Sequence, residues 1–309
     1  MSPVTNREFS GHDDFMAVRQ FLIDSYSGFD RLFNWGIDRW DVLRYTTNAA
    51  GELSGQRDWE QYVRVWEDNG RVVGVIHPED GGDLHVEIDA GYRHLEDEMY
   101  GWGEGYAAPS FRDGSLLVAY TKAHDDLRNR VLKSRGWQLV GPAGYTRRRS
   151  LTAPLPQGPV AAGYAVRTVD IESPADAETR AAISRAAFGS SRTAELAQVI
   201  GRAPTYRPDL DLGAFAADGS LAAHTTVWWD EANRFTVFEP VATHPDHRRL
   251  GLASAVMAEG MRRGVALGAT MAYVGSGEGS PANLLYEALG FVDADQDFRW
   301  ELPDRVDHL

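Results

Sequence analysis

The chain has 309 residues, which is long enough for two domains that each bury a core of their own. It has no cysteine and no apolar run of the roughly 20 residues that a membrane-spanning helix needs. We therefore expect a cytoplasmic protein without disulfides, thiolate metal sites or a cysteine nucleophile. The formal net charge of −14, divided as −6 over residues 1–150 and −8 over residues 151–309, argues against nucleic-acid and membrane partners and suits a small cationic substrate such as an amine.

The first half alternates helical and extended patterns. Residues 15–26 predict a helix, and residues 62–66, 72–76 and 84–88 predict strands, with turns at Asn69-Gly70 and Asp80-Gly81-Gly82. Residues 116–119 predict a further strand, and residues 125–135 a helix that ends at Gly136. The aromatic stretch 29–40 is suited to core packing or to one wall of a substrate cleft.

Residues 151–163 contain three prolines and no charge, so we expect a linker there between a domain at 1–150 and a domain at 164–309. The second half then predicts strands at 164–169, 212–217, 221–229, 234–243 and 271–274, with helices at 175–187, 194–201, 252–267 and 281–289. Residues 291–293 and 298–302 are expected to pair as closing strands.

The two halves correspond in register, which indicates a duplicated fold. Arg93 lies 155 residues before Arg248, and Gly136 lies 154 residues before Gly290. We therefore expect an α+β protein of two tandem domains, each with a mixed, mostly antiparallel sheet flanked by helices.

The segment 241–263 carries the most informative motif. A strand ends, a Pro-Asp turn follows, and a helix opens with Arg248-x-x-Gly251-x-Ala253. Small residues let a ligand approach the backbone, and the first turn of a helix offers free N–H groups and the positive end of the helix dipole. Together with Arg249 beside it, this pattern predicts a site for an anion such as a pyrophosphate.

A second motif, Asn283-x-x-Tyr286 followed by Gly290-Phe291, lies downstream of the strand 271–274. Asn283 and Tyr286 are three residues apart and share one face of the predicted helix. A tyrosine in such a position serves either packing or catalysis.

Together the two motifs resemble the GNAT-type N-acetyltransferase superfamily, over about residues 164–302. The resemblance implies acetyl-CoA as cosubstrate, no metal, and direct transfer of the acetyl group to a primary amine of a small molecule or peptide. It implies Tyr286 as the acid that protonates the departing thiolate, and Glu239, on the strand that leads to the thioester, is the candidate base. His224 is a weaker base candidate, for which a satisfied buried histidine is the simpler interpretation. Trp228 and Trp229 alternate faces, so one of them is a candidate wall of the acceptor site. The cofactor-binding candidates are Val241, Ala242, Thr243, Arg248, Arg249, Leu250, Gly251, Leu252, Ala253, Ser254 and Asn283.

The first half differs from the family's pattern at the residues that would bind the cofactor and donate a proton. Glu96 and Glu98 stand where Gly251 and Ala253 stand in the second half, and Leu132 aligns with Tyr286. Carboxylates at a helix start satisfy its dipole and repel a pyrophosphate. We therefore expect a degenerate, structural or acceptor-shaping first domain, and a monomer or homodimer with one working site. The alternatives are a non-catalytic acyl-CoA-binding sensor and a transferase similar to mycothiol synthase.

Overall fold

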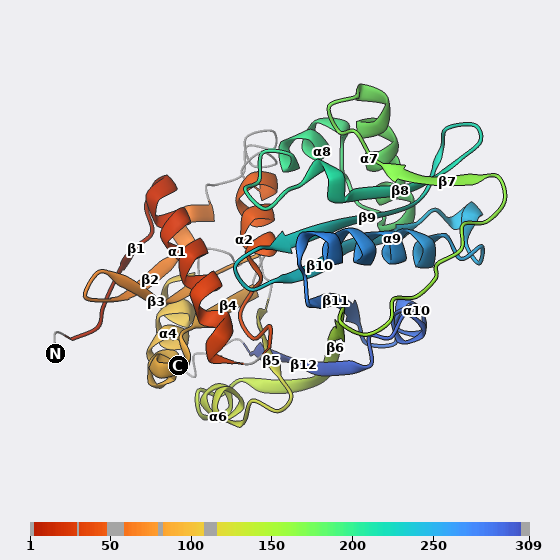
Figure 1. Ribbon diagram of the computed structural model, residues 1–309. Helices are drawn as coiled ribbons and strands as arrows, with labels where there is room; N and C mark the ends of the chain where they lie inside the picture. Colours follow the sequence, from red (N-terminus) through yellow and green to blue (C-terminus); the bar gives the residue numbers. More distant parts are fainter. Residues whose placement is uncertain (1–2, 30, 48–58, 80–82, 108–115, 304–309) are drawn as a thin grey trace. The chain divides into compact units, whose positions relative to one another are not determined.

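The computed structural model describes residues 3–29, 31–47, 59–79, 83–107 and 116–303 (Figure 1). The chain divides into two compact units. The first unit comprises Met1–Ile37, Arg57–Thr146 and Asp295–Leu309, and the second comprises Asp38–Gln56 and Arg147–Ala294. In the part of the chain that the structure describes, no helix is both long and apolar enough to cross a membrane.

The two units are discontinuous in sequence, which the expected boundaries at residues 150 and 164 do not anticipate. The chain passes from the first unit to the second within one strand, β6 (Gln138–Ser150), and returns within another, β12 (Asp293–Leu302). Residues 151–163 contain no helix or strand, as expected of a linker, but they pack closely: Leu151 is buried in the core of the second unit, and a Cβ at Gly158 would lie 2.4 Å from the Cβ of Ala258.

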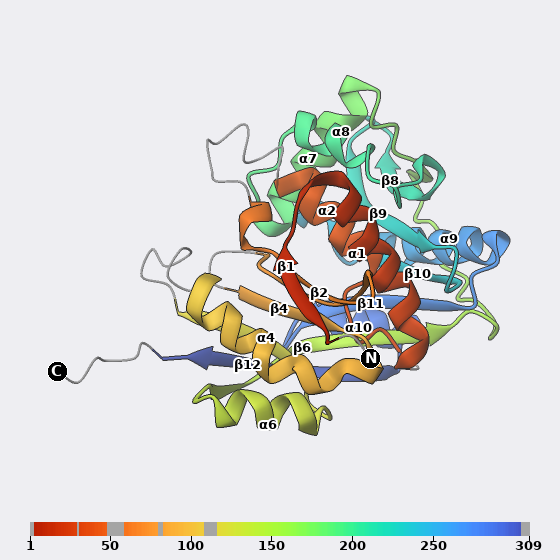
Figure 2. The same ribbon diagram turned by 90° about the vertical axis from the view of Figure 1, so that its left-hand side faces the viewer.

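The first unit consists of short strands and helices (Figure 2). Its helical segments are α1 (Gly11–Ser25), η1 (Tyr26–Gly28), η3 (Trp59–Tyr62), η4 (Ala90–Leu95), α4 (Glu96–Trp102), η5 (Gly103–Ala107) and α6 (Asp126–Ser134). Its strands, besides the parts of β6 and β12 that belong to it, are β1 (Thr5–Glu8), β2 (Arg64–Asp68), β3 (Arg71–His77), β4 (Asp83–Ile88) and β5 (Leu117–Lys122).

The sheet of the first unit has the order β1-β2-β3-β4-β5-β12. Every neighbouring pair in it is antiparallel except β4 with β5, which run parallel. Branched residues of β3 and β4, such as Val73, Ile76 and Ile88, pack against Met99 and Tyr100 of α4 to form the core. Leu132 is completely buried, as a packing residue should be.

The helical segments of the second unit are α2 (Ile37–Val42), η2 (Leu43–Thr47), α7 (Pro174–Phe188), α8 (Ala194–Ile200), η6 (Pro208–Leu210), η7 (Pro245–His247), α9 (Leu252–Leu267) and α10 (Ala282–Ala288). The first residue of α2, Ile37, still belongs to the first unit. Its strands, besides the end of β6 and the first residues of β12, are β7 (Tyr164–Thr168), β8 (Asp211–Ala216), β9 (Leu221–Asp230), β10 (Phe235–Thr243) and β11 (Met271–Gly277).

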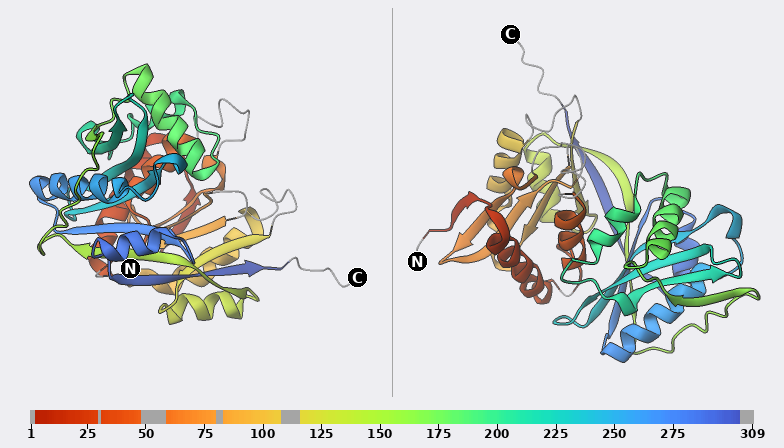
Figure 3. Two further views of the ribbon diagram at one scale, coloured as in Figure 1. Left: turned by 90° about the vertical axis from the view of Figure 1, so that its right-hand side faces the viewer. Right: turned by 90° about the horizontal axis from the view of Figure 1, so that it is seen from above.

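The sheet of the second unit has the order β6-β11-β10-β9-β8-β7, and β10 and β11 are its parallel pair. Helices α7 and α9 cover its two faces (Figure 3). The apolar stripe of α9, with Leu252, Val256 and Met261, packs on β8 and β9 through residues such as Leu212 and Val227. The expected α+β class, with a mixed, mostly antiparallel sheet flanked by helices, is confirmed.

Some elements differ from the expectation. The predicted pairing of residues 291–293 with 298–302 is wrong, because β12 is one continuous strand that pairs with β5, from Asp297 opposite Lys122 to Leu302 opposite Leu117. The patterns missed β1, α2, α4 and the long strand β6. The turn predicted at Asp80-Gly81-Gly82 lies outside the described residues.

Candidate active site

The parallel strands β10 and β11 pair only at their beginnings. The paired residues run from Phe235 opposite Met271 to Val237 opposite Tyr273. On its other side β10 stays paired with β9, through a bulge between Phe238 and Val241. Within the described residues, the β11-facing edge of the last part of β10 therefore has no strand partner, and its backbone groups can bind an extended ligand as an added strand would.

Two of the predicted binding residues, Val241 and Thr243, lie half-buried on this part of β10, whereas Ala242 between them is 2% exposed. Because side chains alternate along a strand, Ala242 faces one side of the sheet and its two neighbours face the other. Contact of these residues with a ligand would therefore run mainly through the backbone.

The turn after β10 leads to an uncapped helix start. Gly251 precedes α9 with φ of 73°, in the left-handed region that favours glycine, and a Cβ there would meet nothing within 4 Å. The N–H of Ala255 makes the first helical hydrogen bond, to the carbonyl of Gly251 at 3.0 Å. No side chain of the described residues caps this helix, and its first turn has no acidic residue. The N–H groups of its first turn therefore remain available to an anion.

The remaining residues of the loop are open to solvent. Arg248, Arg249, Leu250 and Gly251 are exposed, and Arg249 itself has a positive φ of 64°. The following residues become progressively enclosed: Ala253 and Ser254 are half-buried and Leu252 is 2% exposed. Leu252 thus anchors α9 in the core, while the two arginines supply positive charge beside the free N–H groups.

The corresponding helix start in the first unit carries acidic residues that pair with the protein's own side chains. Glu96, the first residue of α4, is completely buried and accepts hydrogen bonds from Nε of Arg93 at 2.6 Å and Nε of Arg128 at 3.0 Å. Glu98 accepts from Nε1 of Trp66 at 2.8 Å. The start of α4 thus carries carboxylates that are paired with the protein's own side chains, whereas the start of α9 carries Gly251 and Ala253.

Tyr286 projects from α10 into the core of the second unit and is 4% exposed. Its ring packs edge-on against Phe291, with centroids 6.3 Å apart. Burial, together with the nearby carboxylate of Glu239, raises the pKa of Tyr286 to about 12. The phenol therefore keeps its proton at physiological pH, and the interaction shows that the structure brings the two predicted catalytic residues into electrostatic reach of each other.

Glu239 lies in the bulge of β10 and is exposed. Its backbone carbonyl accepts a hydrogen bond of 2.6 Å from Nε1 of Trp228. Trp229, on the opposite face of β9, belongs to the apolar core. Of the two tryptophans, Trp228 is thus the one that fixes the strand at the predicted base.

His224 belongs to a buried network of polar side chains. Its Nε2 lies 2.5 Å from Oδ1 of Asp211, whose other oxygen accepts from Nε of Arg180 and the hydroxyl of Tyr206, each at 3.0 Å. Burial lowers the pKa of His224 even though Asp211 opposes the shift. The histidine is therefore held by an internal partner, in agreement with the simpler of the two interpretations.

Two charged residues near Glu239 had no signal in the sequence. Asp38 of α2 is 5% exposed, and burial, with Glu239 adding to the effect, raises its pKa to about 7. Arg192, between α7 and α8, has its pKa lowered by burial and by Arg180, against the attraction of Glu239. Asp38 belongs to the second unit because the next turn of α2 is tied there: Asp41 accepts hydrogen bonds from the backbone N–H and the hydroxyl of Thr205.

Asn283 holds the loop between β11 and α10. Its side-chain oxygen accepts from the hydroxyl of Ser276 at 2.6 Å and from Nε of Arg147 at 3.3 Å, and its Nδ2 donates to the carbonyl of Gly277 at 3.2 Å. Arg147 also pairs with Glu287 on α10 at 3.1 Å. These bonds orient the helix that carries Tyr286, and a direct role of Asn283 in cofactor binding stays a prediction.

A group of potential metal ligands belongs to the first unit. Glu79, Asp83 and His85 each offer one ligand atom, all within 4.8 Å of one another. Acidic groups commonly gather without a metal, and this group has no part in the chemistry described below.

The comparisons with known proteins agree with the geometry. The sequence model of the acetyltransferase (GNAT) family matches residues 185–291, which include β10, α9 and Tyr286. A search among curated proteins finds no significant match. Residues 185–291, which lie in the second unit, are therefore similar in sequence to the GNAT acetyltransferase family.

Similar solved structures extend over nearly the whole chain. The GCN5-related N-acetyltransferase from Sphaerobacter thermophilus has a TM-score of 0.64 at 16% identity, covering 97% of this chain and 96% of that one. A tandem GNAT protein from the clavulanic acid biosynthesis pathway has a TM-score of 0.65 at 16% identity, covering 97% and 99%. A GNAT-family acetyltransferase from Colwellia psychrerythraea has a TM-score of 0.61 at 12% identity, covering 98% and 100%. At these identities the likeness concerns the fold, and it is consistent with two GNAT-like folds in tandem.

Proposed function

We propose that the second unit transfers the acetyl group of acetyl-CoA directly to a primary amine of a small molecule or peptide. The observation that carries the proposal is the uncapped start of α9, with Gly251 in the left-handed conformation, next to the strand β10 whose free edge faces the gap between β10 and β11. An anionic cosubstrate with an extended arm fits both features at once.

The residues present suit acetyl-CoA. The first-turn N–H groups of α9 and the side chains of Arg248 and Arg249 would hold the pyrophosphate, and the backbone at Val241 and Thr243 would bind the pantetheine arm. The open space around Gly251 allows close approach of the ligand to the backbone. The thioester supplies the acetyl group, and this chain's residues have only to position the two substrates and move protons.

Glu239 and Tyr286 are suited to the two proton transfers. A neutral amine attacks the thioester carbonyl, so a base must first take the ammonium proton. Glu239, exposed on β10, is the proposed base, directly or through water. Tyr286 is the proposed acid, because its phenol is protonated at physiological pH and can donate to the departing thiolate.

The charges around Glu239 favour a cationic acceptor. The carboxylate of Glu239 is close enough to Asp38 to raise the pKa of Asp38, and Asp41 adds to the same effect. Arg192 supplies one positive charge near Glu239, and an ammonium group entering this region would reduce the remaining repulsion between the carboxylates. This supports a small amine or a peptide amino group, rather than a nucleic acid or a lipid surface, as the acceptor.

The proposal is tested by release of free thiol from acetyl-CoA across a panel of amines, with acetyl-CoA binding measured by calorimetry. The decisive variant is Gly251→Glu, which places a carboxylate at the helix start, as Glu96 does in the first unit. We expect one binding site in the natural protein and loss of both binding and turnover in the variant.

Gly219→Glu is the matched control. Gly219 also has a positive φ, of 87°, is exposed, and has an open surrounding, but it lies in the turn between β8 and β9. Backbone strain and added charge are therefore the same, and binding should survive. Binding that persists in Gly251→Glu would refute the proposed cofactor site, whereas binding without turnover of any amine would indicate the acyl-CoA-binding sensor instead.

A further inference from the structure

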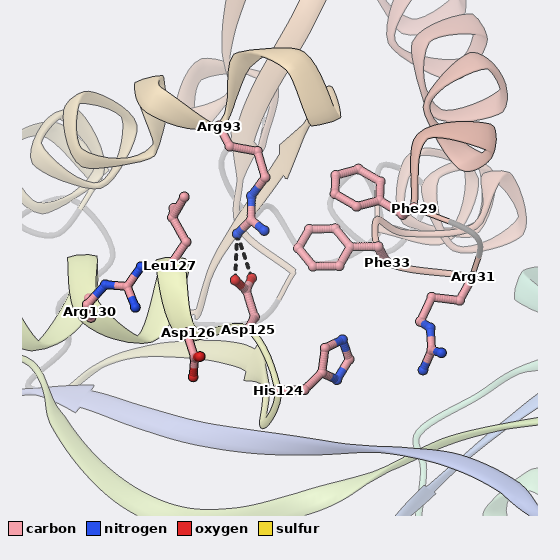
Figure 4. A pocket seen from close by; sticks show the side chains of 9 residues that line it. All are labelled: Phe29, Arg31, Phe33, Arg93, His124, Asp125, Asp126, Leu127 and Arg130. Atoms are coloured by element: carbon pink, nitrogen blue, oxygen red, sulfur yellow. Dashed lines mark hydrogen bonds and ion pairs between the residues drawn. The ribbon is translucent and has the colours of Figure 1, made fainter.

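The first unit has a pocket of about 350 Å³ where its parallel strands end (Figure 4). β4 and β5 are paired at Asp83 with Val118 and at Leu84 with Ala119. Residues that follow the two strands line the pocket: Arg93 comes after β4, and His124 and Asp125 come directly after β5. We call it the β4–β5 pocket. It occupies the same place in its sheet as the proposed cofactor site occupies beside β10 and β11.

A pyrophosphate does not suit this pocket, because the protein's own carboxylates already occupy its cationic groups. Asp125 accepts two hydrogen bonds from Nη2 of Arg93, at 2.6 and 2.7 Å, and caps α6 by accepting from the N–H of Arg128 at 3.2 Å. Nε of Arg93 is taken by the buried Glu96. A dianionic group would face these carboxylates at short range.

An aromatic wall stands on one side of the pocket. The rings of Phe29 and Phe33 stack with centroids 4.1 Å apart and planes at 10°, and both side chains are half-buried. The guanidinium groups of Arg93 and Arg128 lie over the Phe33 ring at 4.9 and 5.0 Å. Phe33 is thus contacted by Phe29 and by both guanidinium groups, so a flat apolar ligand would stack on the half-buried ring of Phe29.

Arg130 stands on the side opposite the aromatic wall, next to Leu127 (Figure 4). It is exposed, and within the described residues its guanidinium makes no hydrogen bond or ion pair. Arg93 is already paired with Asp125 and Glu96, and Arg31 with Asp295, so among the described lining residues Arg130 is the guanidinium that has no carboxylate partner. One such guanidinium favours a ligand with a single negative charge.

We propose that the β4–β5 pocket binds a small aromatic monocarboxylate, with its ring against Phe29 and its carboxylate on Arg130. A guanidinium binds a carboxylate through two parallel hydrogen bonds, and the pocket volume is within the range of small-molecule sites. The first unit is then a ligand-binding domain in its own right. This inference is independent of the function proposed for the second unit.

The test uses the full chain and 1-naphthoate as the probe, with binding followed by calorimetry. The neutral 1-naphthamide has the same ring and shape without the charge. We expect one 1-naphthoate per chain and at least about tenfold weaker binding of the amide, because a charge-assisted hydrogen bond contributes on the order of a factor of ten. Binding should persist in Gly251→Glu, which separates this pocket from the site at α9.

Arg130→Gln should weaken 1-naphthoate binding by about tenfold, by the same reasoning. Lys133→Gln is the matched control, since Lys133 is also exposed on α6 and the variant loses the same charge outside the pocket. Phe29→Ala should weaken the probe and its amide alike, because it removes the stacking surface. The proposal is overturned if 1-naphthoate fails to bind at millimolar concentration, if Arg130→Gln binds it as tightly as Lys133→Gln does, or if adenosine diphosphate binds in the pocket more tightly than 1-naphthoate.

Discussion

Asp38 provides a quantitative test of the electrostatics of the second unit. Its carboxyl is buried on α2, no side chain of the described residues donates a hydrogen bond to it, and its pKa is raised from 3.8 to about 7. A carboxyl whose pKa is raised by folding binds its proton more tightly in the folded state than in the unfolded one. The free energy of unfolding must then decrease as the pH rises from about 4 to about 7.

The size of the effect follows from the shift of about three pKa units. At about 1.36 kcal/mol per unit, ionising Asp38 costs the folded state about 4 kcal/mol above pH 7. In Asp38→Asn the side chain no longer titrates, while its amide oxygen can still accept the local backbone hydrogen bond. We expect the variant to be more stable than the natural protein by less than about 1 kcal/mol at pH 4, by about 3 kcal/mol at pH 6 and by about 4 kcal/mol at pH 8.

The measurement is urea unfolding of both proteins at these three pH values, on either side of the isoelectric point of about 5.1. All other titrating groups are shared, so they cancel in the difference between the two proteins. Glu231→Gln, which removes an exposed carboxylate from the turn between β9 and β10, is the control for the loss of one negative charge. A stability difference for Asp38→Asn that is the same at pH 4 and pH 8 would refute the reasoning.

Three further predictions concern the second unit. Tyr286→Phe should lower the rate of acetyl transfer by about 10²–10⁴-fold in single-turnover kinetics and leave acetyl-CoA affinity unchanged; an unaltered transfer rate would leave Tyr286 as a packing residue. Asp211→Asn should lower the free energy of unfolding by about 3–5 kcal/mol at neutral pH, because Arg180 would stay buried without its counter-charge, and a loss of stability confined to alkaline pH would contradict this. Gly260→Ala should destabilise by about 1–3 kcal/mol, measured by denaturant unfolding, because its Cβ would lie 2.7 Å from Phe238 and 2.8 Å from Val227; an equally stable variant would show that α9 can shift.

The sequence predicted the local structure of the second unit well. The helix expected at 252–267 has those same bounds in the structure, because Gly251 and Gly268 with positive φ end the pattern on both sides. The strand that leads to Gly251 and the helix that carries Tyr286 were also found from periodicity and glycine positions. These features depend on residues close together in the chain, which is the information that a pattern contains.

What the sequence could not predict depends on contacts between distant segments. Asp38 stands in an aromatic stretch without any motif, and its chemistry arises only because α2 packs within the second unit, beside Glu239. The strand β6 was missed because Gly141, Pro142 and a run of arginines interrupt its alternation. The predicted pairing of residues 298–302 was wrong for a related reason, because a short strand pattern does not specify which strand it will join.

The passage of the chain between the two units within β6 and β12 has a consequence for synthesis. The first unit receives its strand beside β5 from residues 297–302, so its sheet stays incomplete while the ribosome is still making the second unit. The second unit in turn includes a helix from residues 38–42, made near the beginning. Neither unit can complete its fold independently as it emerges, and a chain cut within residues 151–163 leaves β5 on one fragment and its neighbour β12 on the other. We therefore expect truncated chains to expose unpaired strands and to be degraded, because neither unit is complete without residues from the other end of the chain.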